Sequence, residues 1–301
     1  MTQANFLTDI KPFLQTNWDK ANFQEPTAVQ IKTIPLILEG KDVIAESPTG
    51  TGKTLAYVLP LLNNIDANKK NAQIVILAPS RELVMQIFDE IKKWSEGSGL
   101  TSASFIGGAN IKRQVEKLKK SPQVIVGTPG RIHELIKMKK LKMHEVKAFV
   151  LDEGDHLLTP EHKNTMKDII KTTLNERQVV LFSATLNEST ESKARDLMKD
   201  NPEIIKVGLE EVPVGDVEHV YLVCEQREKI TILERLAKTV RMKALGFVKD
   251  IGSLDVLAEK LEFKGVDLHL LHSDTKKEER EAALKSLRTD TQGLLLATDV
   301  A

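Results

Sequence analysis

Cysteine is almost absent from this sequence: its 301 residues contain only Cys224. A single thiol cannot form a disulfide within the chain, and it excludes a metal site built from several cysteines. Cys224 ends the apolar run HVYLVC, so we expect it to be a small buried residue of a β-strand.

Long apolar runs and an excess of charge of one sign are also missing. No apolar stretch approaches the about 18 residues that a membrane-spanning helix needs, and the first residues show no basic and apolar leader. Lys plus Arg and Asp plus Glu each number 43, so the formal net charge is zero. We therefore expect a cytoplasmic protein without a membrane segment. A nucleic-acid site, if there is one, has to be a local surface, because the whole protein does not attract polyanions.

The most informative stretch covers residues 42–62 and reads DVIAESPTGTGKTLAYVLPLL. Its pattern predicts a buried strand at 43–45, a Gly-rich turn, and a helix from Lys53 to Leu62. A phosphate-binding loop requires this order, because the N–H groups of the turn and the positive end of the helix then face the anion. The match to G-x-x-x-x-G-K-[ST] is incomplete, since Ser47 stands where the first glycine is usual.

The residue types in this turn predict ATP and Mg²⁺ as cofactors. Lys53 is expected to reach the β and γ phosphates, and the Thr54 hydroxyl is expected to ligate Mg²⁺. A Gly-rich surface turn without function is the alternative. The predicted nucleotide-binding residues of the loop are Ser47, Pro48, Thr49, Gly50, Thr51, Gly52, Lys53 and Thr54.

An acidic cluster follows a later apolar run, in the segment VLDEGD at 150–155. A carboxylate at the end of a buried strand is placed to hold Mg²⁺ directly or through water, and Asp152 is the candidate. Glu153 beside it can orient and deprotonate the water that attacks the γ-phosphate. The predicted catalytic residues are thus Lys53, Asp152 and Glu153; a solvated acidic turn is the alternative. We expect His156 to be a structural or surface residue.

Apolar runs recur between helical segments along the whole chain. The runs AQIVILAP, SASFIG, QVIVGTP, KAFVLDEGD and QVVLFSAT are continuous rather than alternating. This pattern predicts an α/β fold with a doubly wound parallel sheet that is buried on both faces. The pattern stops at residues 208–216 and restarts with HVYLVC, KALGFVKD, VDLHLLH and GLLLATD. We therefore predict a first domain at 1–207, a linker at 208–216 and a second α/β domain at 217–301.

The segment FQEPTAVQ, ahead of the loop, contains a glutamine between apolar residues. It predicts a helix that starts at Pro26 and Thr27 and is interrupted or bent near Pro35. The Gln30 amide offers a donor and an acceptor, which suits N7 and N6 of adenine. The alternative is an ordinary solvent-facing glutamine.

Taken in order, FQEPTAVQ, SPTGTGKT, PSRELVMQ, a Gly-Gly pair at 107–108, TPGR, DEGD and SAT resemble the motif set of DEAD-box RNA helicases. The sequences of these motifs are similar to those of short bacterial members of that family. The resemblance implies two RecA-like domains of the P-loop NTPase type and ATP-driven local separation of short RNA duplexes. It also implies that Gln30 reads adenine together with Phe23 and Thr27, with Phe6 as a further stacking candidate.

The same resemblance implies where RNA is held and how it is coupled to the nucleotide. The implied RNA-binding residues are Arg81, Gly108, Thr128 and Arg131, and the implied coupling residues are Asp155, Ser183 and Thr185. Glycine backbone, helix N-termini and Arg suit phosphates and carry no base information, so binding independent of sequence is expected. We expect a monomer.

Two positions depart from the family pattern. The third letter of the acidic motif is Gly154 instead of alanine, which is expected to loosen the turn. Asn22 stands where a glycine is usual before Phe23. Neither departure removes a reacting group.

The 301 residues stop at ATDVA, ahead of the arginine-rich motif H-R-x-G-R-x-G-R that the resemblance leads us to expect. In the family its arginines act on the γ-phosphate, so these residues alone are expected to have an incomplete second domain and weak hydrolysis. Two other functions stay open. One is a non-enzymatic module that binds ATP and RNA, and the other is a DNA helicase or translocase of the same superfamily, which the glutamine motif disfavours.

Overall fold

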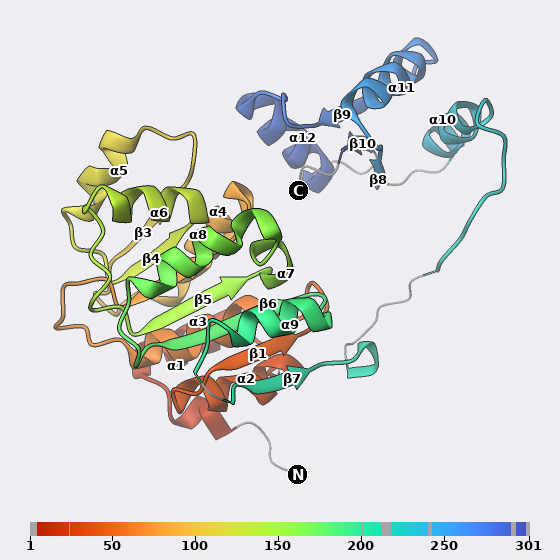
Figure 1. Cartoon of the computed structure of the whole chain (residues 1–301). Helices are drawn as coiled ribbons and strands as arrows, with labels where there is room; N and C mark the ends of the chain where they lie inside the picture. Colours follow the sequence, from red (N-terminus) through yellow and green to blue (C-terminus); the bar gives the residue numbers. More distant parts are fainter. Residues whose placement is uncertain are drawn as a thin grey trace. The chain divides into compact units, whose positions relative to one another are not determined.

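The chain forms two compact units, residues 1–215 and residues 216–301 (Figure 1). The structure, a computed structural model, describes residues 5–23, 25–199, 201–211, 218–239, 243–289 and 293–298. Both units have helices packed around a parallel sheet, which confirms the predicted α/β class. Within the described residues, no helix combines the length and the apolar character needed to cross a membrane.

The first unit is built on a parallel sheet whose strand order is β3-β4-β2-β5-β6-β1-β7. Five of its strands follow predicted apolar runs and β1 precedes the Gly-rich turn, but β7 was not predicted. The seven strands are β1 (Val43–Glu46), β2 (Ile74–Leu77), β3 (Ser102–Phe105), β4 (Val124–Gly127), β5 (Ala148–Asp152), β6 (Gln178–Ser183) and β7 (Glu203–Lys206). Because every strand pair is parallel, all the carboxyl ends lie at one edge of the sheet.

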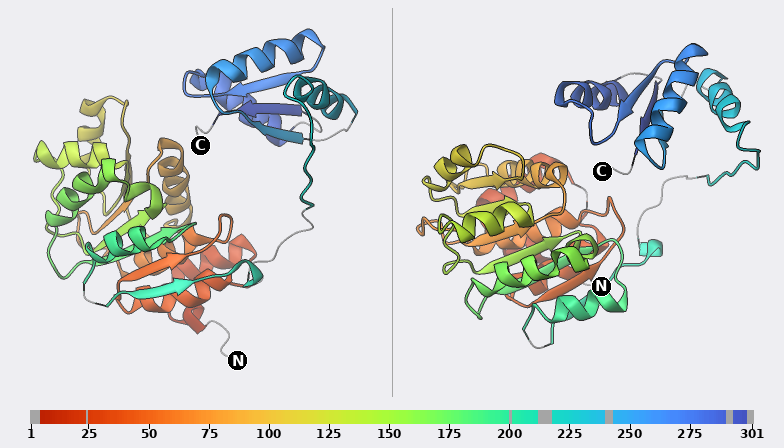
Figure 2. Two further views of the ribbon diagram at one scale, coloured as in Figure 1. Left: turned by 45° about the vertical axis from the view of Figure 1, so that its right-hand side comes forward. Right: turned by 45° about the horizontal axis from the view of Figure 1, so that its top comes forward.

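Helices cover both faces of this sheet (Figures 1 and 2). Alternate strand residues supply two separate cores: Val43 and Ala45 belong to one, and Ile44 belongs to the other. The first face carries η1 (Asn5–Thr8), α1 (Pro12–Ala21), α2 (Ala28–Leu38), α3 (Lys53–Asn64) and α4 (Arg81–Trp94). The other face carries α5 (Ile111–Leu118), α6 (Pro129–Lys137), α7 (Gly154–Leu157), α8 (Pro160–Lys171) and α9 (Glu188–Arg195). The doubly wound arrangement predicted from the sequence is therefore confirmed.

Helix α2 runs through Pro35 to Leu38, so of the predicted interruption or bend the interruption is wrong, and the bend stays a prediction. Proline inside a helix costs about 3 kcal/mol, because it removes one hydrogen bond and crowds the preceding turn. Val29, Ile34 and Ile37 are fully buried along the same helix. Burying three such side chains contributes about 1.5–3 kcal/mol each, which outweighs the local cost.

Asn22 ends α1 in the left-handed conformation, with φ 55° and ψ 36°. A helix that ends in this way favours glycine, and asparagine is the next most tolerated residue. The departure from the family pattern at this position therefore keeps the backbone conformation that a glycine would provide.

The second unit has a three-stranded parallel sheet in the order β8-β10-β9. The strands are β8 (Lys243–Phe247), β9 (Leu268–Leu271) and β10 (Gly293–Ala297), and the helices are α10 (Lys229–Thr239), α11 (Ile251–Phe263) and α12 (Lys277–Thr289). Its core gathers apolar side chains of α11, β9 and β10, with α10 packed against them. This core is much smaller than either core of the first unit.

The predicted strand HVYLVC is wrong, because residues 218–225 contain no strand. Val220, Tyr221 and Val223 are 72%, 86% and 92% exposed, and Cys224 is half-buried rather than buried. A β-forming run becomes a strand only where a neighbour satisfies its backbone groups, and β8, β9 and β10 pair with one another instead.

In the region of the predicted linker, residues 209–211 form the short helix η2 (Leu209–Glu211). Residues 212–217, which include the rest of that linker and the predicted start of the second domain, lie outside the described residues. The predicted domain limits therefore stay a prediction.

Candidate functional site

The predicted functional residues of the first unit gather at the carboxyl edge of its sheet. The Gly-rich loop follows β1, α4 begins after β2, α6 begins directly after β4, and the acidic cluster ends β5. Ligands of open parallel sheets bind beyond this edge. Loops far apart in the sequence thus meet at one edge of the sheet.

The loop between β1 and α3 has the backbone of a phosphate-binding turn. Gly50 and Gly52 have φ values of 77° and 86°, a region that residues with a Cβ avoid. A Cβ placed on Gly52 would also lie 2.5 Å from Nε2 of Gln30. Lys53 is the first residue of α3, so the positive end of that helix faces the loop.

Ser47, the departure from the strict motif, is fully buried and closes the loop. Its hydroxyl lies 2.7 Å from the Thr51 hydroxyl, which in turn donates to the carbonyl of Pro48 at 2.8 Å. Since the Thr51 proton goes to Pro48, Ser47 is the donor in the first bond. A serine here replaces the freedom of glycine with a hydrogen bond across the turn.

The ammonium group of Lys53 lies between this loop and the acidic cluster. Its Nζ donates to the carbonyl of Ser47 at 2.8 Å. Burial lowers the pKa of Lys53, and the carboxylates of Asp152, Glu153 and Asp155 oppose that shift. The lysine therefore faces both the loop and the acidic cluster, the place where a bound phosphate chain requires a cation.

Asp152 is 4% exposed and held in one orientation by two donors. Tyr57 of α3 donates its hydroxyl to Oδ2 at 2.8 Å, and the amide of Glu153 donates to Oδ1 at 3.0 Å. Burial raises the pKa of Asp152, although Tyr57, Lys53 and the Glu153 amide favour the charged form. The sequence reading missed Tyr57; its position three residues after Thr54, on the same face of α3, was the signal that could have revealed it.

The donor chemistry at this point fits Mg²⁺. The Tyr57 hydroxyl donates to Asp152, and Thr54 acts to lower the pKa of Tyr57 against the larger effects of burial and Asp152, so both predicted ligands lie near this hydroxyl. Mg²⁺ prefers hard oxygen donors and takes only one or two carboxylates, completing its shell with water and phosphate. Thr54 and Asp152 are the residues that would hold it.

Glu153, the predicted general base, has a left-handed backbone with φ 55° and ψ 55°. Such a conformation is unfavourable for a residue with a side chain, and conformations of this kind concentrate at functional sites. Gly154 follows it, and a Cβ there would lie 2.5 Å from Cγ of Leu181, which is fully buried. The space of the missing methyl is thus filled by Leu181.

Asp155 connects the acidic turn to the end of β6. Thr185 donates its hydroxyl to Oδ2 of Asp155 at 2.7 Å, and the Asp155 amide donates to Oγ of Ser183 at 3.3 Å. Ser183 donates in turn to the carbonyl of Thr185 at 2.7 Å. Burial acts to raise the pKa of Asp155, but the bonds with Thr185 and Ser183 and the nearby His156 outweigh it and lower the pKa. The three predicted coupling residues therefore form one network.

The opposite pKa shifts of Asp152 and Asp155 predict opposite effects on stability. Asp152 has a raised folded-state pKa, so its stabilising contribution is present in acid, below the unfolded value of about 3.9, and is lost as the pH rises through the folded value. Asp155 has a lowered pKa, so its contribution is present above about 3.9 and is lost as the pH falls through the folded value.

We therefore expect Asp152→Asn to raise the melting temperature at pH 7 and Asp155→Asn to lower it. The difference in melting temperature between each variant and the parent should become smaller toward acid pH. Calorimetry from pH 3 to pH 8 in a chelating buffer checks this, and shifts of the same sign for both variants would contradict it.

Gln30 is 4% exposed, so the alternative of a solvent-facing glutamine is wrong. Its Oε1 accepts from the amide of Thr27 at 3.0 Å, and its Nε2 donates to the carbonyl of Gly52 at 3.2 Å. The amide thus ties the start of α2 to the phosphate loop. Its role as the adenine reader stays a prediction.

The two aromatic candidates lie in one cluster with the tryptophans. Phe6 is 5% exposed and packs edge-on against Trp18, which leaves it little surface for a ligand. Phe23 is 43% exposed and stacks on Trp94 with the ring centres 6.1 Å apart. Of the two, Phe23 is the one that presents a ring surface.

Of the four residues implied for RNA binding, Gly108 belongs to the loop of residues 107–110, and the other three contact this loop. The Arg81 guanidinium packs on Gly108, where an added Cβ would lie 2.6 Å from Nη2. Thr128 accepts at Oγ1 from the amide of Gly107 at 3.3 Å. Arg131 is 8% exposed and donates to the carbonyl of Ala109 at 3.1 Å. Arg81 is therefore the exposed cation among these four residues, whereas Arg131 is buried and holds the loop through its hydrogen bond to Ala109.

Known proteins share these features across the whole chain. A family model for DEAD/DEAH box helicases matches residues 27–193, and one for the helicase conserved C-terminal domain matches residues 228–301. The probable ATP-dependent RNA helicase YfmL of Bacillus subtilis is 56% identical over all of this chain and 80% of its own length. The DEAD-box ATP-dependent RNA helicase CshC of Bacillus cereus is 51% identical over 98% of this chain and 75% of its own.

Solved structures agree with the sequence relatives. Dbp5 of Saccharomyces cerevisiae, solved with RNA and ADP BeF3, matches with a TM-score of 0.86 and 27% identity over all of this chain and 76% of its own. A DEAD box protein of Methanococcus jannaschii matches with a TM-score of 0.66 and 29% identity over 99% of this chain and 81% of its own. The chain belongs to the DEAD-box family of ATP-dependent RNA helicases.

Proposed function

We propose that this protein couples RNA-stimulated hydrolysis of ATP to the local separation of short RNA duplexes. The observation that carries the proposal is the acidic turn 152–155. The charges of Asp152 and Glu153 act on the ammonium of Lys53 at the end of the phosphate loop, and Asp155, two residues after Glu153, is bonded to Thr185 and Ser183. A change at the nucleotide can thus reach the end of β6 through one rigid turn.

In this proposal, different residues contact the adenine base, the phosphates and the metal ion. Gln30, Thr27 and Phe23 read adenine, and residues 47–54 wrap the phosphates with Lys53 as their cation. Thr54 and Asp152 would hold Mg²⁺, which would supply positive charge to the phosphates when bound. Glu153 takes the proton of the attacking water.

RNA is held through its backbone in this proposal, at the loop 107–110 and the helix starts around it. Arg81 supplies charge, Gly108 and Thr128 supply close approach and backbone donors, and Arg131 keeps the loop in place. Contacts of this kind position a strand without reading its bases, so binding is independent of sequence. We further propose that the protein is cytoplasmic and acts as a monomer. Sedimentation with and without RNA would check the monomeric state.

The test compares polynucleotides on one preparation. ATP turnover is measured with no nucleic acid, with RNA and with DNA of the same sequence, and strand separation is measured on a short labelled RNA duplex. Stimulation by RNA alone, with ATP-dependent separation, supports the proposal. Equal stimulation by DNA would favour the DNA translocase, and binding without turnover in any form of the chain would favour the non-enzymatic module.

For a polypeptide of these 301 residues by itself we propose slow turnover. Removing an arginine that contacts the γ-phosphoryl group typically costs roughly 10³ to 10⁵-fold in rate. A fusion that adds the remaining fifth of the Bacillus subtilis relative tests this directly. RNA-stimulated rates that are similar in the two polypeptides would mean that an arginine already present completes the site.

Gln30→Ala is expected to reduce the preference for ATP over GTP by about 5- to 150-fold, since a bidentate contact to adenine is worth about 1–3 kcal/mol of discrimination. The substitution also removes the bond to Gly52, which should weaken both nucleotides equally. The ratio of the two affinities, taken from a competition titration, therefore isolates base reading. An unchanged ratio would assign adenine to another residue.

A further inference from the structure

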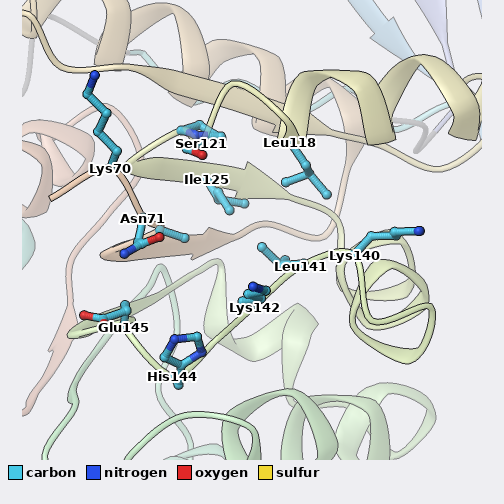
Figure 3. Close-up of a pocket in the computed structure, with 12 residues that line it drawn as sticks. Lys70, Asn71, Leu118, Ser121, Ile125, Lys140, Leu141, Lys142, His144 and Glu145 are labelled. Atoms are coloured by element: carbon cyan, nitrogen blue, oxygen red, sulfur yellow. The ribbon is translucent and has the colours of Figure 1, made fainter.

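Exposed lysines gather at the edge of the first sheet opposite the nucleotide site. Segments 69–72, 117–122 and 139–147 lead into β2, β4 and β5, which are neighbours in the sheet. Together they line a cavity of about 190 Å³ (Figure 3). The lysines of the three segments, here called the amino-edge lysines, are Lys69, Lys70, Lys117, Lys119, Lys120, Lys139, Lys140, Lys142 and Lys147.

These segments hold one acidic residue, Glu145, against nine lysines, a formal charge of +8 in a chain whose net charge is zero. Among the described residues, the ion pairs engage only Lys119 of this group, with Glu116 at 2.7 Å. Lysines elsewhere in the first unit, such as Lys41 and Lys167, do pair with carboxylates. The lysines of these segments therefore concentrate positive charge that few of the ion pairs among the described residues compensate.

The arrangement favours an extended polyanion over a small enclosed anion. All nine lysines are exposed, and the side chains of Lys70 and Lys140 extend outward from the cavity (Figure 3). Flexible ammonium groups spread over an open surface suit a chain of phosphates, since each acts as a point charge. Asn71 and Ser121, which also line the cavity, add neutral polar groups for the same purpose.

We propose that the amino-edge lysines form a second RNA-binding surface, which holds the backbone of RNA that extends beyond the site at residues 107–110. This inference rests on the proposed function. The three segments contain no Phe, Tyr or Trp, so they lack the large aromatic platforms on which bases usually stack. They also expose no large apolar side chain, which disfavours a membrane surface as the partner.

The two surfaces are far enough apart to be tested separately. Crossing the sheet from Gln73 to Ala78 takes five residue steps, roughly 17 Å at about 3.3 Å per residue. A stacked RNA of about five nucleotides has four steps of about 3.4 Å and spans roughly 14 Å, so in its stacked form it is too short to occupy both edges. An RNA of about 40 nucleotides exceeds that separation several-fold.

The experiment compares Lys70→Gln/Lys140→Gln/Lys142→Gln with a control of equal charge, Lys41→Gln/Lys193→Gln/Lys199→Gln. Lys41 precedes β1, Lys193 lies on α9 and Lys199 follows that helix ahead of β7; β1 and β7 are the last two strands in the sheet order, away from β4 and β2. Affinity for both RNAs is measured from about 50 to 300 mM salt, a range in which phosphate contacts are resolved. For the longer RNA, the first variant should lose about 10- to 100-fold at 0.1 M salt, and its salt slope should shrink by about 2.

The five-nucleotide RNA should bind both variants as it binds the parent. Equal losses in the two variants, or unchanged affinity for the longer RNA in the first, would overturn the second surface. Loss of binding to anionic vesicles alone would also overturn it and assign a membrane partner. A parent that binds neither RNA would instead refute the proposed function, so the two failures are distinguishable.

Discussion

Lys53→Ala is expected to lower the affinity for ATP by about 30- to several-thousand-fold, a cost of about 2–5 kcal/mol for truncating one partner of a buried charge pair. Lys53 is the cation at the start of α3, and its ammonium already bonds to the carbonyl of Ser47 inside the loop. The backbone N–H groups of the loop stay in place in the variant. What is lost is the only charged side chain among residues 47–54.

Titration with a fluorescent ATP analogue measures this effect. Lys92→Ala is the matched control, because Lys92 lies on α4 with an exposed partner, Asp89, and surface pairs of this kind contribute little. A melting curve separates loss of binding from loss of folding. Parent-like affinity in a folded Lys53→Ala protein would show that the loop between β1 and α3 does not hold phosphate.

The phosphate loop could be predicted because its signal is local. Glycines at 50 and 52 indicate a turn with positive φ values, which both residues adopt, and the strand, turn and helix are adjacent in sequence. The bond between Ser47 and Thr51 could not be predicted in the same way, since it depends on how tightly the turn closes. Residue types fixed the chemistry of the loop, and its exact closure is a property of the packed fold.

The strands likewise divide into those with a local sequence signal and those that depend on pairing in the packed fold. Long apolar runs such as those of β5 and β6 were recognised, because burial on both faces leaves a continuous pattern. The four residues of β7 are too few for a pattern; their strand exists because β1 offers its free edge. Residues 219–224 have the stronger β pattern and no strand, because none of the described strands pairs with them.

Within the site, types of residue were easier to predict than their surroundings. The network of Asp155, Ser183 and Thr185 follows from motifs that end adjacent strands. The burial of Arg131 does not follow from sequence, since arginine is mostly exposed, whereas the burial of Phe6 is usual for phenylalanine and runs against the stacking role that the resemblance implied. Tyr57 was not predicted, because a tyrosine on an apolar helix face is expected to be an ordinary core residue. Its hydrogen bond becomes evident only once the fold brings Asp152 opposite its hydroxyl.

Glu153→Gln is expected to retain ATP binding and to lower the rate of hydrolysis by about 10² to 10⁴-fold, the usual contribution of a positioned general base. The amide has nearly the shape of the carboxylate and can still hold a water, but it cannot accept the proton. Since the left-handed backbone at this position is set by the turn between β5 and α7, we expect the new side chain to occupy the same place.

Single-turnover hydrolysis with RNA present, in the fusion that carries the remaining fifth of the Bacillus subtilis relative, measures the chemical step apart from product release. Glu161→Gln, an exposed residue in the first turn of α8, is the control and should match the parent. If Glu153→Gln bound ATP and hydrolysed it at the parent rate, the base would have to be another group at this edge. Asp155 would then be the nearest candidate, although its bonds to Thr185 and Ser183 keep it charged and engaged elsewhere.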